Sequence, residues 1–208
     1  HRAPMPLALV RPDEAGNARY SFHRPFQAPF RPEGGLLKGV RAFHFGSLFA
    51  LEARTAEGVE ALLQEALEEG ALVSYDPNLR QNPTEKERSL IAGYLARTDL
   101  LKLSLEDAKL LFPENPIEGV KRLPIPLKVL TLGPEGAVAF QGEKEVRLPA
   151  EKVQVVDTVG AGDAFTAGLL ALLLKWGYGR ENLKALSLKE LKRALQGAVA
   201  LSALACTV

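Results

Sequence analysis

The chain has 208 residues, of which 47% are hydrophobic, and this is enough for one main domain with a substantial core. Its net charge of +1, with no dense run of basic residues, argues against a nucleic-acid-binding protein. The single cysteine, Cys206, excludes an internal disulfide and suits a reducing cytoplasm, and the longest apolar run, 168–174, is too short to span a membrane. We therefore expect a cytoplasmic protein without a nucleic-acid or membrane partner.

The first predicted element is a β-hairpin. Segments 6–10 and 18–23 alternate between apolar and polar residues, and they flank the turn-rich loop 13–17. The segment 25–35 is rich in proline and glycine, which is typical of a connection between two parts of a chain. We therefore expect residues 1–30 to form a small β-sheet part and residues 31–208 to form the core.

From residue 40 onward, predicted strands alternate with predicted helices, which is typical of a mostly parallel sheet with helices on both faces. The expected strands are 40–45, 71–75, 100–103, 128–132, 137–140, 146–148 and 153–156. The expected helices are 53–69, 84–98, 104–112, 164–176 and 187–205. Ser/Thr-x-x-acid patterns at Thr84 and Ser187 predict capped helix starts. This pattern predicts a doubly wound α/β fold.

Polar and glycine residues follow several of these strands at the point where each strand ends. Ligands bind outside the carboxyl ends of strands in open α/β sheets, so these loops are candidate binding segments. They are Gly46-Ser47 and 76–80; segments 104–107 and 131–136 also follow predicted strands. Two of them have a purely structural alternative. Segment 76–80 can be a turn with a solvated Arg80, and 104–107 can be a helix-capping box.

The most distinctive segment is 157–168, Asp-Thr-Val-Gly-Ala-Gly-Asp-Ala-Phe-Thr-Ala-Gly. Gly160 and Gly162 permit close approach of a ligand to the backbone, and N–H groups at the start of a helix favour an anion. Asp163 beside a bound phosphate suits a group that takes a proton from an attacking hydroxyl. The third glycine of a dinucleotide-binding loop and the Gly-Lys-Ser/Thr of a P-loop are both lacking. A plain turn, with Asp163 as a helix cap, is the remaining alternative.

Segment 157–165 resembles the second signature of the ribokinase-like (PfkB) family of carbohydrate kinases. Segment 76–80, Asp-Pro-Asn-Leu-Arg, resembles the Asp-Pro-Asn-x-Arg of fructokinases and 2-keto-3-deoxygluconate kinases. The resemblance covers nearly the whole chain and implies a ribokinase-like fold in which a small β-sheet lid, within 1–30, covers the sugar. The family's earlier glycine-rich signature and its last residues have no counterpart here, so we expect the core to be incomplete at both ends.

The resemblance implies a role for each matching residue. Asp163 is the expected general base, and the backbone N–H groups of Gly160, Ala161 and Gly162 are the expected anion hole. Arg80 is expected to place its guanidinium against the transferring phosphoryl group. On the sugar side the expected residues are Arg24, Asn78 and Asp163.

The resemblance also implies a nucleotide side and a cation side. Thr131, Gly133 and Gly136 match the family's Thr-Leu-Gly-x-x-Gly loop at the adenosine phosphates. Ser104 and Asp107 replace the asparagine and glutamate of the motif that holds Mg²⁺, so Asp107 is expected to reach the metal through water. Asp157 and Thr158 match residues at a monovalent cation site, which leaves K⁺ binding open.

The expected activity is ATP- and Mg²⁺-dependent phosphorylation of a sugar hydroxyl, on fructose or a related ketose. Segments 22–24 and 76–80 favour the fructokinase-like assignment. The alternatives are a kinase of the same family for 2-keto-3-deoxygluconate, ribose or a nucleoside, and an inactive sugar-binding module of the same fold. An intact Asp163 and Gly-Ala-Gly argue against the inactive module. A homodimer formed through the lid is a further expectation.

Overall fold

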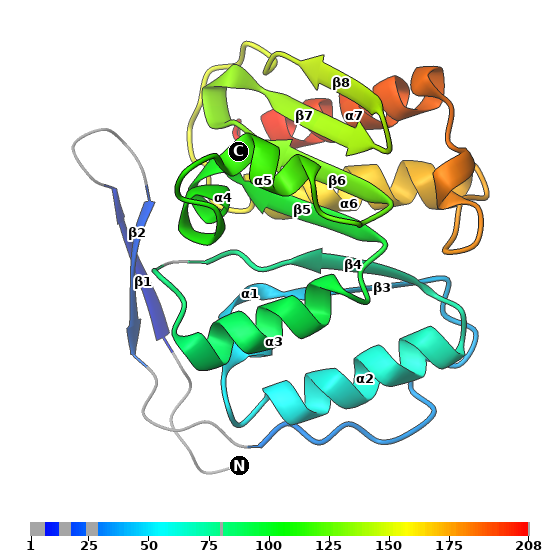
Figure 1. Cartoon of the computed structure of the whole chain (residues 1–208). Coiled ribbons are helices and arrows are strands. Elements are labelled where there is room, and N and C mark those ends of the chain that lie inside the picture. The colour runs from blue at the N-terminus through cyan, green and yellow to red at the C-terminus, as the bar shows by residue number, and fades with distance from the viewer. Residues whose placement is uncertain (1–6, 13–17, 24–28, 80, 208) are drawn as a thin grey trace.

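The computed structural model describes residues 7–12, 18–23, 29–79 and 81–207. The first two of these ranges form an antiparallel two-stranded sheet, β1 (Leu7–Pro12) with β2 (Ala18–His23). Figure 1 shows this hairpin standing beside the larger sheet of the molecule. The predicted hairpin is confirmed, whereas its role as a lid and the division at residue 30 stay predictions.

The larger sheet has six strands in the order in which they occur in the chain. They are β3 (Ala42–Gly46), β4 (Leu72–Asp76), β5 (Leu100–Ser104), β6 (Leu127–Thr131), β7 (Ala137–Gln141) and β8 (Lys144–Leu148). Strands β3 to β6 are parallel, and β7 and β8 are antiparallel to their neighbours. A short 3₁₀ turn, Gly133–Glu135, joins β6 to β7. The mostly parallel sheet predicted from the alternating pattern is confirmed.

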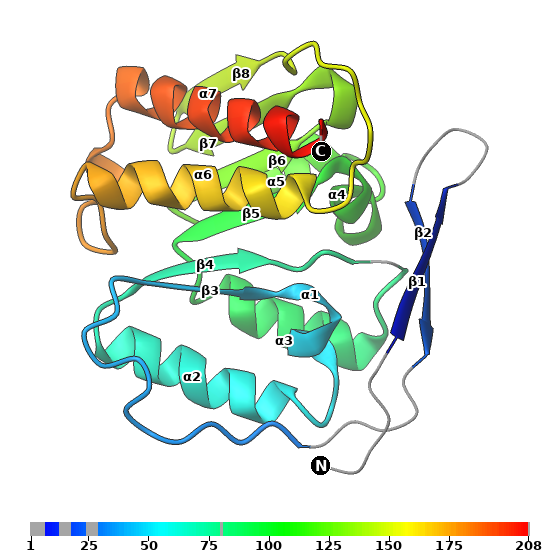
Figure 2. The same ribbon diagram turned by 180° about the vertical axis from the view of Figure 1, so that it is seen from behind.

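Helices cover both faces of this sheet, as expected for a doubly wound fold. On one face lie α1 (Ser47–Leu51), α2 (Ala56–Glu68), α3 (Glu85–Leu95), α4 (Leu105–Leu111) and α5 (Pro116–Lys121). On the other face lie α6 (Ala161–Lys175) and α7 (Leu188–Ala205), which Figure 2 shows in front of the half of the sheet that holds β5 to β8. None of the helices in the described ranges is long and apolar enough to cross a membrane.

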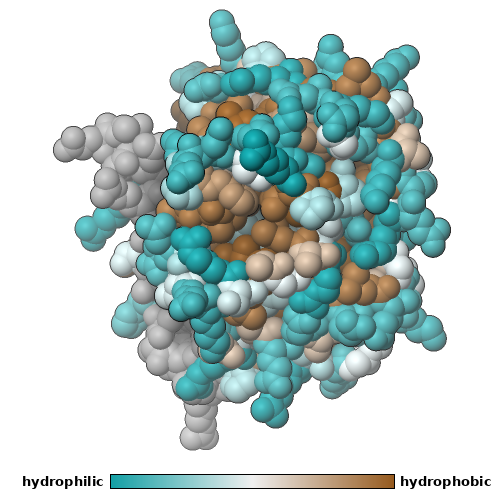
Figure 3. Space-filling model, viewed as in Figure 1, coloured by the Kyte–Doolittle hydropathy of each residue, from teal (hydrophilic) through white to brown (hydrophobic). Residues whose placement is uncertain are grey.

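Two hydrophobic cores lie on the two faces of the sheet, and the side-chain alternation of each strand divides its residues between them. Leu101 and Leu103 of β5 belong to the core under α1 to α5, whereas Leu100 belongs to the core under α6 and α7. Figure 3 shows hydrophobic side chains in a hollow on the face with α3, α4 and α5, bordered by hydrophilic ones. The same alternation directs Lys102 of β5 toward the face that α6 covers.

One predicted strand is wrong. Residues 153–156 form no strand, and Val153, Val155 and Val156 are 38%, 58% and 69% exposed. The segment is held at the end of α7 instead, where the N–H groups of Val156 and Asp157 donate to the Cys206 carbonyl at 2.8 and 3.4 Å. A β-branched run favours a strand only where a neighbouring strand can pair with it, and here the segment lies against a helix end.

Candidate functional site

The glycine turn at the start of α6 has the backbone geometry of an open anion site. Gly160 is the N-cap residue and has a φ of +80°, a left-handed conformation that glycine adopts without strain. No side chain of the described residues caps α6, so N–H groups of its first turn remain available to a ligand. The N–H of Ala161 is an exception among the three predicted donors, because it donates to the Thr158 carbonyl at 3.2 Å.

Asp163 lies in the first turn of α6, and its side chain is exposed. The helix backbone fixes the position of its Cα, while the carboxylate has room to meet a substrate. Asp157 is also exposed and shapes the approach to the turn, since its Oδ1 accepts from the Val159 N–H at 3.0 Å. The predicted base and anion turn therefore sit together on the surface of the protein.

Polar side chains of β3, β4 and β5 point toward the face of the sheet that α6 covers. His44 Nδ1 is hydrogen-bonded to Ser74 Oγ at 3.0 Å, and Lys102 Nζ donates to Asp76 Oδ2 at 2.9 Å. Partial desolvation of the ring lowers the pKa of His44, and the charges of Asp76 and Asp163 act in the opposite direction. These polar groups thus share one electrostatic environment with the candidate base.

Sequence reasoning missed the Lys102–Asp76 pair. The available signal was a lysine inside the apolar strand Leu100-Leu101-Lys102-Leu103. A charge at such a position is almost never fully buried without a partner, and the neighbouring strand supplies one. Both side chains are only 7% exposed.

The loop after β4 is held by a residue from the next candidate segment. Asn78 has a φ of +45°, an uncommon conformation for a residue with a side chain. The next N–H, that of Leu79, donates to Asp107 Oδ1 at 2.7 Å. Asp107 Oδ2 accepts from the N–H and the hydroxyl of Ser104, which completes the predicted capping box of α4. Asp107 therefore joins the two candidate segments, while the predicted Arg80 and Arg24 lie outside the described residues.

Asp107 is 2% exposed, and burial raises the pKa of its carboxyl, an effect that the hydrogen bonds from Ser104 oppose. Its carboxylate accepts three hydrogen bonds, two at Oδ2 and one at Oδ1. This leaves Oδ1 with one further acceptor position. Within the described residues no group of three or more His, Cys, Asp or Glu side chains could hold a metal ion.

A cavity of about 670 Å³ adjoins the glycine turn and brings together most of the predicted nucleotide residues. The predicted residues that line it are Thr131, Gly133, Gly136, Thr158, Ala161 and Gly162. Phe165 and the carboxyl end of α7, including Val199 and Cys206, supply an apolar wall that sequence reasoning did not assign to a site. The only signal for that wall was the amphipathic pattern of the last helix. A mostly apolar cavity next to an anion turn suits a ligand with a flat apolar ring and phosphates.

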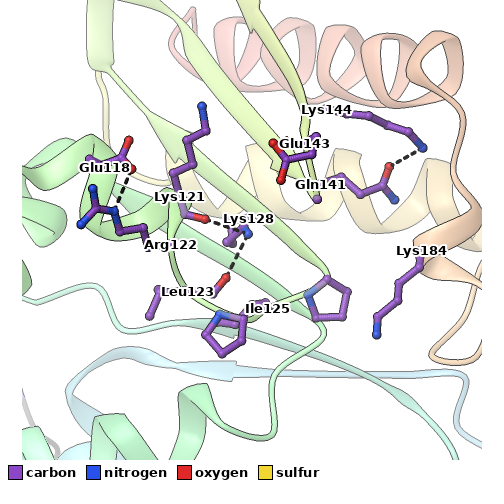
Figure 4. A pocket seen from close by; sticks show the side chains of 13 residues that line it. Glu118, Lys121, Arg122, Leu123, Ile125, Lys128, Gln141, Glu143, Lys144 and Lys184 are labelled. Atoms are coloured by element: carbon purple, nitrogen blue, oxygen red, sulfur yellow. Dashed lines mark hydrogen bonds and ion pairs between the residues drawn. The ribbon is translucent and has the colours of Figure 1, made fainter.

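A second cavity, of about 780 Å³, lies at the opposite end of the strands (Figure 4). Lys128 Nζ donates to the carbonyls of Lys121 and Leu123, and Lys144 Nζ donates to the Leu186 carbonyl. Figure 4 shows Lys128 turned toward the carbonyl oxygens of Lys121 and Leu123. Lys128 and Lys144 thus hold loops in place, so the cavity at the glycine turn is the better candidate site.

Comparisons with known proteins show what this chain is similar to. The family model of the pfkB family of carbohydrate kinases matches residues 1–208. A fructokinase of Rhizobium leguminosarum bv. trifolii is 36% identical over 183 residues, which are 82% of this chain and 55% of that protein. The chain spans about half the length of the curated relatives that it matches.

Solved structures of two fructokinases are similar along almost the whole chain. The structure from Xylella fastidiosa with bound ATP superposes with a TM-score of 0.86 at 26% identity, over 99% of this chain and 68% of that one. The Vibrio cholerae double mutant bound to fructose, ADP and potassium gives a TM-score of 0.76 at 25% identity, over 97% and 66% of the two chains. The fold predicted from the sequence is therefore confirmed.

Proposed function

Because this chain belongs to the pfkB family of carbohydrate kinases, we propose that it transfers the γ-phosphoryl group of ATP to a hydroxyl of fructose or a related ketose. One observation carries the proposal. Asp163, whose carboxylate is exposed, lies in the first turn of α6. The glycine turn at the start of the same helix borders a cavity of about 670 Å³. An acceptor for a proton and a binding turn for a phosphate are thus supplied by neighbouring residues.

In the proposed mechanism, Asp163 accepts the proton of the sugar hydroxyl as its oxygen attacks the γ-phosphorus in line. The N–H groups of Gly160 and Gly162 stabilise the charge on the phosphoryl oxygens, and such a donor contributes about 3 kcal/mol. Arg80, which follows the loop that Asp107 holds, is proposed to add a positive charge from the other side. The backbone of Asp163 and the glycine turn are fixed at the start of α6, so little reorganisation of these two groups should accompany the reaction.

The nucleotide and the cations are assigned by the same reasoning. Thr131, Gly133 and Gly136 are proposed to border the adenosine phosphates, with Ser104 nearby. Mg²⁺, when bound, would neutralise negative charge on the phosphates, and Asp107 is proposed to hold it through water. Asp157 and Thr158 are proposed as part of a K⁺ site, a proposal supported by the potassium in the related Vibrio cholerae fructokinase structure.

Fructose is proposed as the substrate because fructokinases recur among the relatives and because segment 76–80 matches their motif. Arg24 and Asn78 are the proposed sugar contacts. A homodimer formed through β1 and β2 and a cytoplasmic location remain predictions.

The test is coupled ATP turnover by the purified protein with fructose, ribose, 2-keto-3-deoxygluconate and adenosine, alongside Asp163→Asn. We expect turnover on fructose and a loss of about 10²- to 10⁴-fold in kcat in the variant, the usual contribution of a general base. The matched control is Glu143→Gln, which neutralises an exposed carboxylate in the cavity at the opposite end of the strands and should leave turnover unchanged.

Each possible result decides a different part of the proposal. Turnover on another sugar keeps the mechanism and replaces the substrate. Undiminished turnover by Asp163→Asn removes Asp163 from its role as the base. If no sugar is turned over, yet one of them raises the melting temperature, the protein is a sugar-binding module and the proposed activity is wrong.

A further inference from the structure

Burying the Lys102–Asp76 pair costs free energy, because both charges lose their contact with water. Both side chains are 7% exposed, and their contact is a single hydrogen bond of 2.9 Å. The second carboxylate oxygen, Asp76 Oδ1, is buried and has no hydrogen-bond partner among the described residues. A buried ion pair with an unsatisfied oxygen is often no more stable than apolar residues of similar volume. The stability of the fold therefore does not explain why a lysine and an aspartate occupy these two buried positions.

The position of the ammonium suggests another reason. A Cβ placed on Gly162 would lie 3.1 Å from Lys102 Nζ, so the ammonium lies directly against the glycine turn. Among the described residues, and apart from the two chain neighbours of Gly162 and its own helix backbone, only atoms of the Lys102 side chain lie within 4 Å of that point, so the Asp76 carboxylate is farther away. The pair is thus a dipole whose positive end faces the turn. Beneath the surface, where water does not screen it, such a charge acts strongly on a nearby anion.

We propose that Lys102 is a positioning residue of the phosphoryl-transfer site, which places a fixed positive charge behind the glycine turn, and that Asp76 holds this charge in place. This inference rests on the proposed function, because it takes the transferred phosphoryl group to be the anion at the turn. The charge adds to that of the helix start and strengthens the N–H donors of Gly162 and its neighbours toward a phosphate.

Parallel pairing places the two residues side by side. Ser74 and Tyr75 of β4 pair with Leu100 and Leu101 of β5, and Asp76 and Lys102 are the next residues on each strand. The absence of a side chain at Gly162 leaves room for the ammonium, which would have to shift by a few tenths of an ångström if a methyl group were added there. Lys102, Asp76 and Gly162 therefore form one structural unit.

The experiment measures the affinities of ATP and ADP for the protein by calorimetry, together with kcat, for Lys102→Met, for Asp76→Asn with Lys102→Met, and for Lys128→Met. A charge that acts on the transferring group should affect ATP more than ADP. We expect Lys102→Met to lose about 10- to 100-fold in ATP affinity, the range of a charge-assisted contact. Its ADP affinity should stay within about twofold of wild type.

The double variant separates support of the fold from support of the site. It removes both charges, so its melting temperature should return toward that of the wild type, while its ATP affinity stays low. Lys128→Met is the matched control, because Lys128 is also a buried strand lysine but lies at the opposite end of the sheet. It should lower the melting temperature and leave ATP affinity unchanged.

The proposal is overturned if the double variant binds ATP as the wild type does, or if Lys102→Met loses affinity for ATP and ADP equally. It is also overturned if the wild type binds no ATP, because the turn then holds no phosphate. If the wild type binds ATP but phosphorylates no sugar, the proposed function fails while the ATP and ADP comparison still decides the role of Lys102.

Discussion

The two ends of the six-stranded sheet each contain a buried lysine, and the two lysines are satisfied in different ways. Lys102, near the carboxyl end of β5, donates to the carboxylate of Asp76. Lys128, at the amino end of β6, donates to the backbone carbonyls of Lys121 and Leu123. Lys128 therefore holds a loop through its backbone carbonyls. Lys102 instead binds a carboxylate close to the open N–H groups of the α6 start, where its charge is proposed to favour an anion.

The cavities at the two ends of the sheet differ in the same way. The one at the amino end is the larger, at about 780 Å³ against about 670 Å³. Two of its lysines, Lys128 and Lys144, nevertheless hold backbone carbonyls of the chain, while the smaller cavity adjoins a helix start that no described side chain caps. The groups left unsatisfied identify the candidate site better than volume does.

The largest change in stability is expected at the carboxyl end, from Gly136→Ala. Gly136 has a φ of +98°, and an added Cβ would lie 2.0 Å from the Leu148 carbonyl oxygen, so the β6–β7 turn would have to move. We expect a loss of about 3 kcal/mol in the free energy of unfolding, measured with urea. Gly133→Ala is the control, since its Cβ would meet nothing within 4 Å and only its φ of +58° causes strain. It should cost about 1 kcal/mol, and equal losses would show that close packing at Gly136 is unimportant.

At the amino end, Lys128→Met should cost about 2 kcal/mol at neutral pH, because the carbonyls of Lys121 and Leu123 lose their donor. Burial lowers the pKa of Lys128 from its ordinary value of 10.5. The unfolded chain therefore holds this proton more tightly, and the wild-type free energy of unfolding gains a contribution as pH rises from the lowered pKa toward 10.5.

The variant lacks that gain, so the stability difference between wild type and Lys128→Met should widen with pH in this window. Urea unfolding of both proteins at several alkaline pH values measures the difference and cancels the titration of other groups. A difference that stays constant with pH would mean that burial does not lower the pKa of Lys128.

The smallest effects are expected at two helix starts. Ser187 and Ser104 each complete a capping box, with Glu190 and Asp107 respectively. Replacing either serine by alanine should cost about 1 kcal/mol in the free energy of unfolding. Only Ser104→Ala should also lower turnover, because Asp107 holds the loop before Arg80. Equal turnover in the two variants would separate that loop from the reaction.

Sequence reasoning succeeded where the cause of the structure is local. The capping boxes at Thr84 and Ser187 and the glycine turn before α6 depend on a few neighbouring residues, and the structure contains all three. The predicted strand at 153–156 failed because strand propensity does not provide a pairing partner. The contact between Lys102 and Asp76 depends on the register of β4 against β5, which no local pattern specifies.

The carboxylate of Asp107 has a consequence for how this protein can vary. It accepts a hydrogen bond from Leu79, 28 residues away in the chain, and also caps its own helix. A chain that replaces Asp107 must supply a new acceptor for the Leu79 N–H or reshape the loop around Asn78. Substitutions in these two segments should therefore be strongly epistatic, so that a change in one is tolerated mainly in the company of a change in the other.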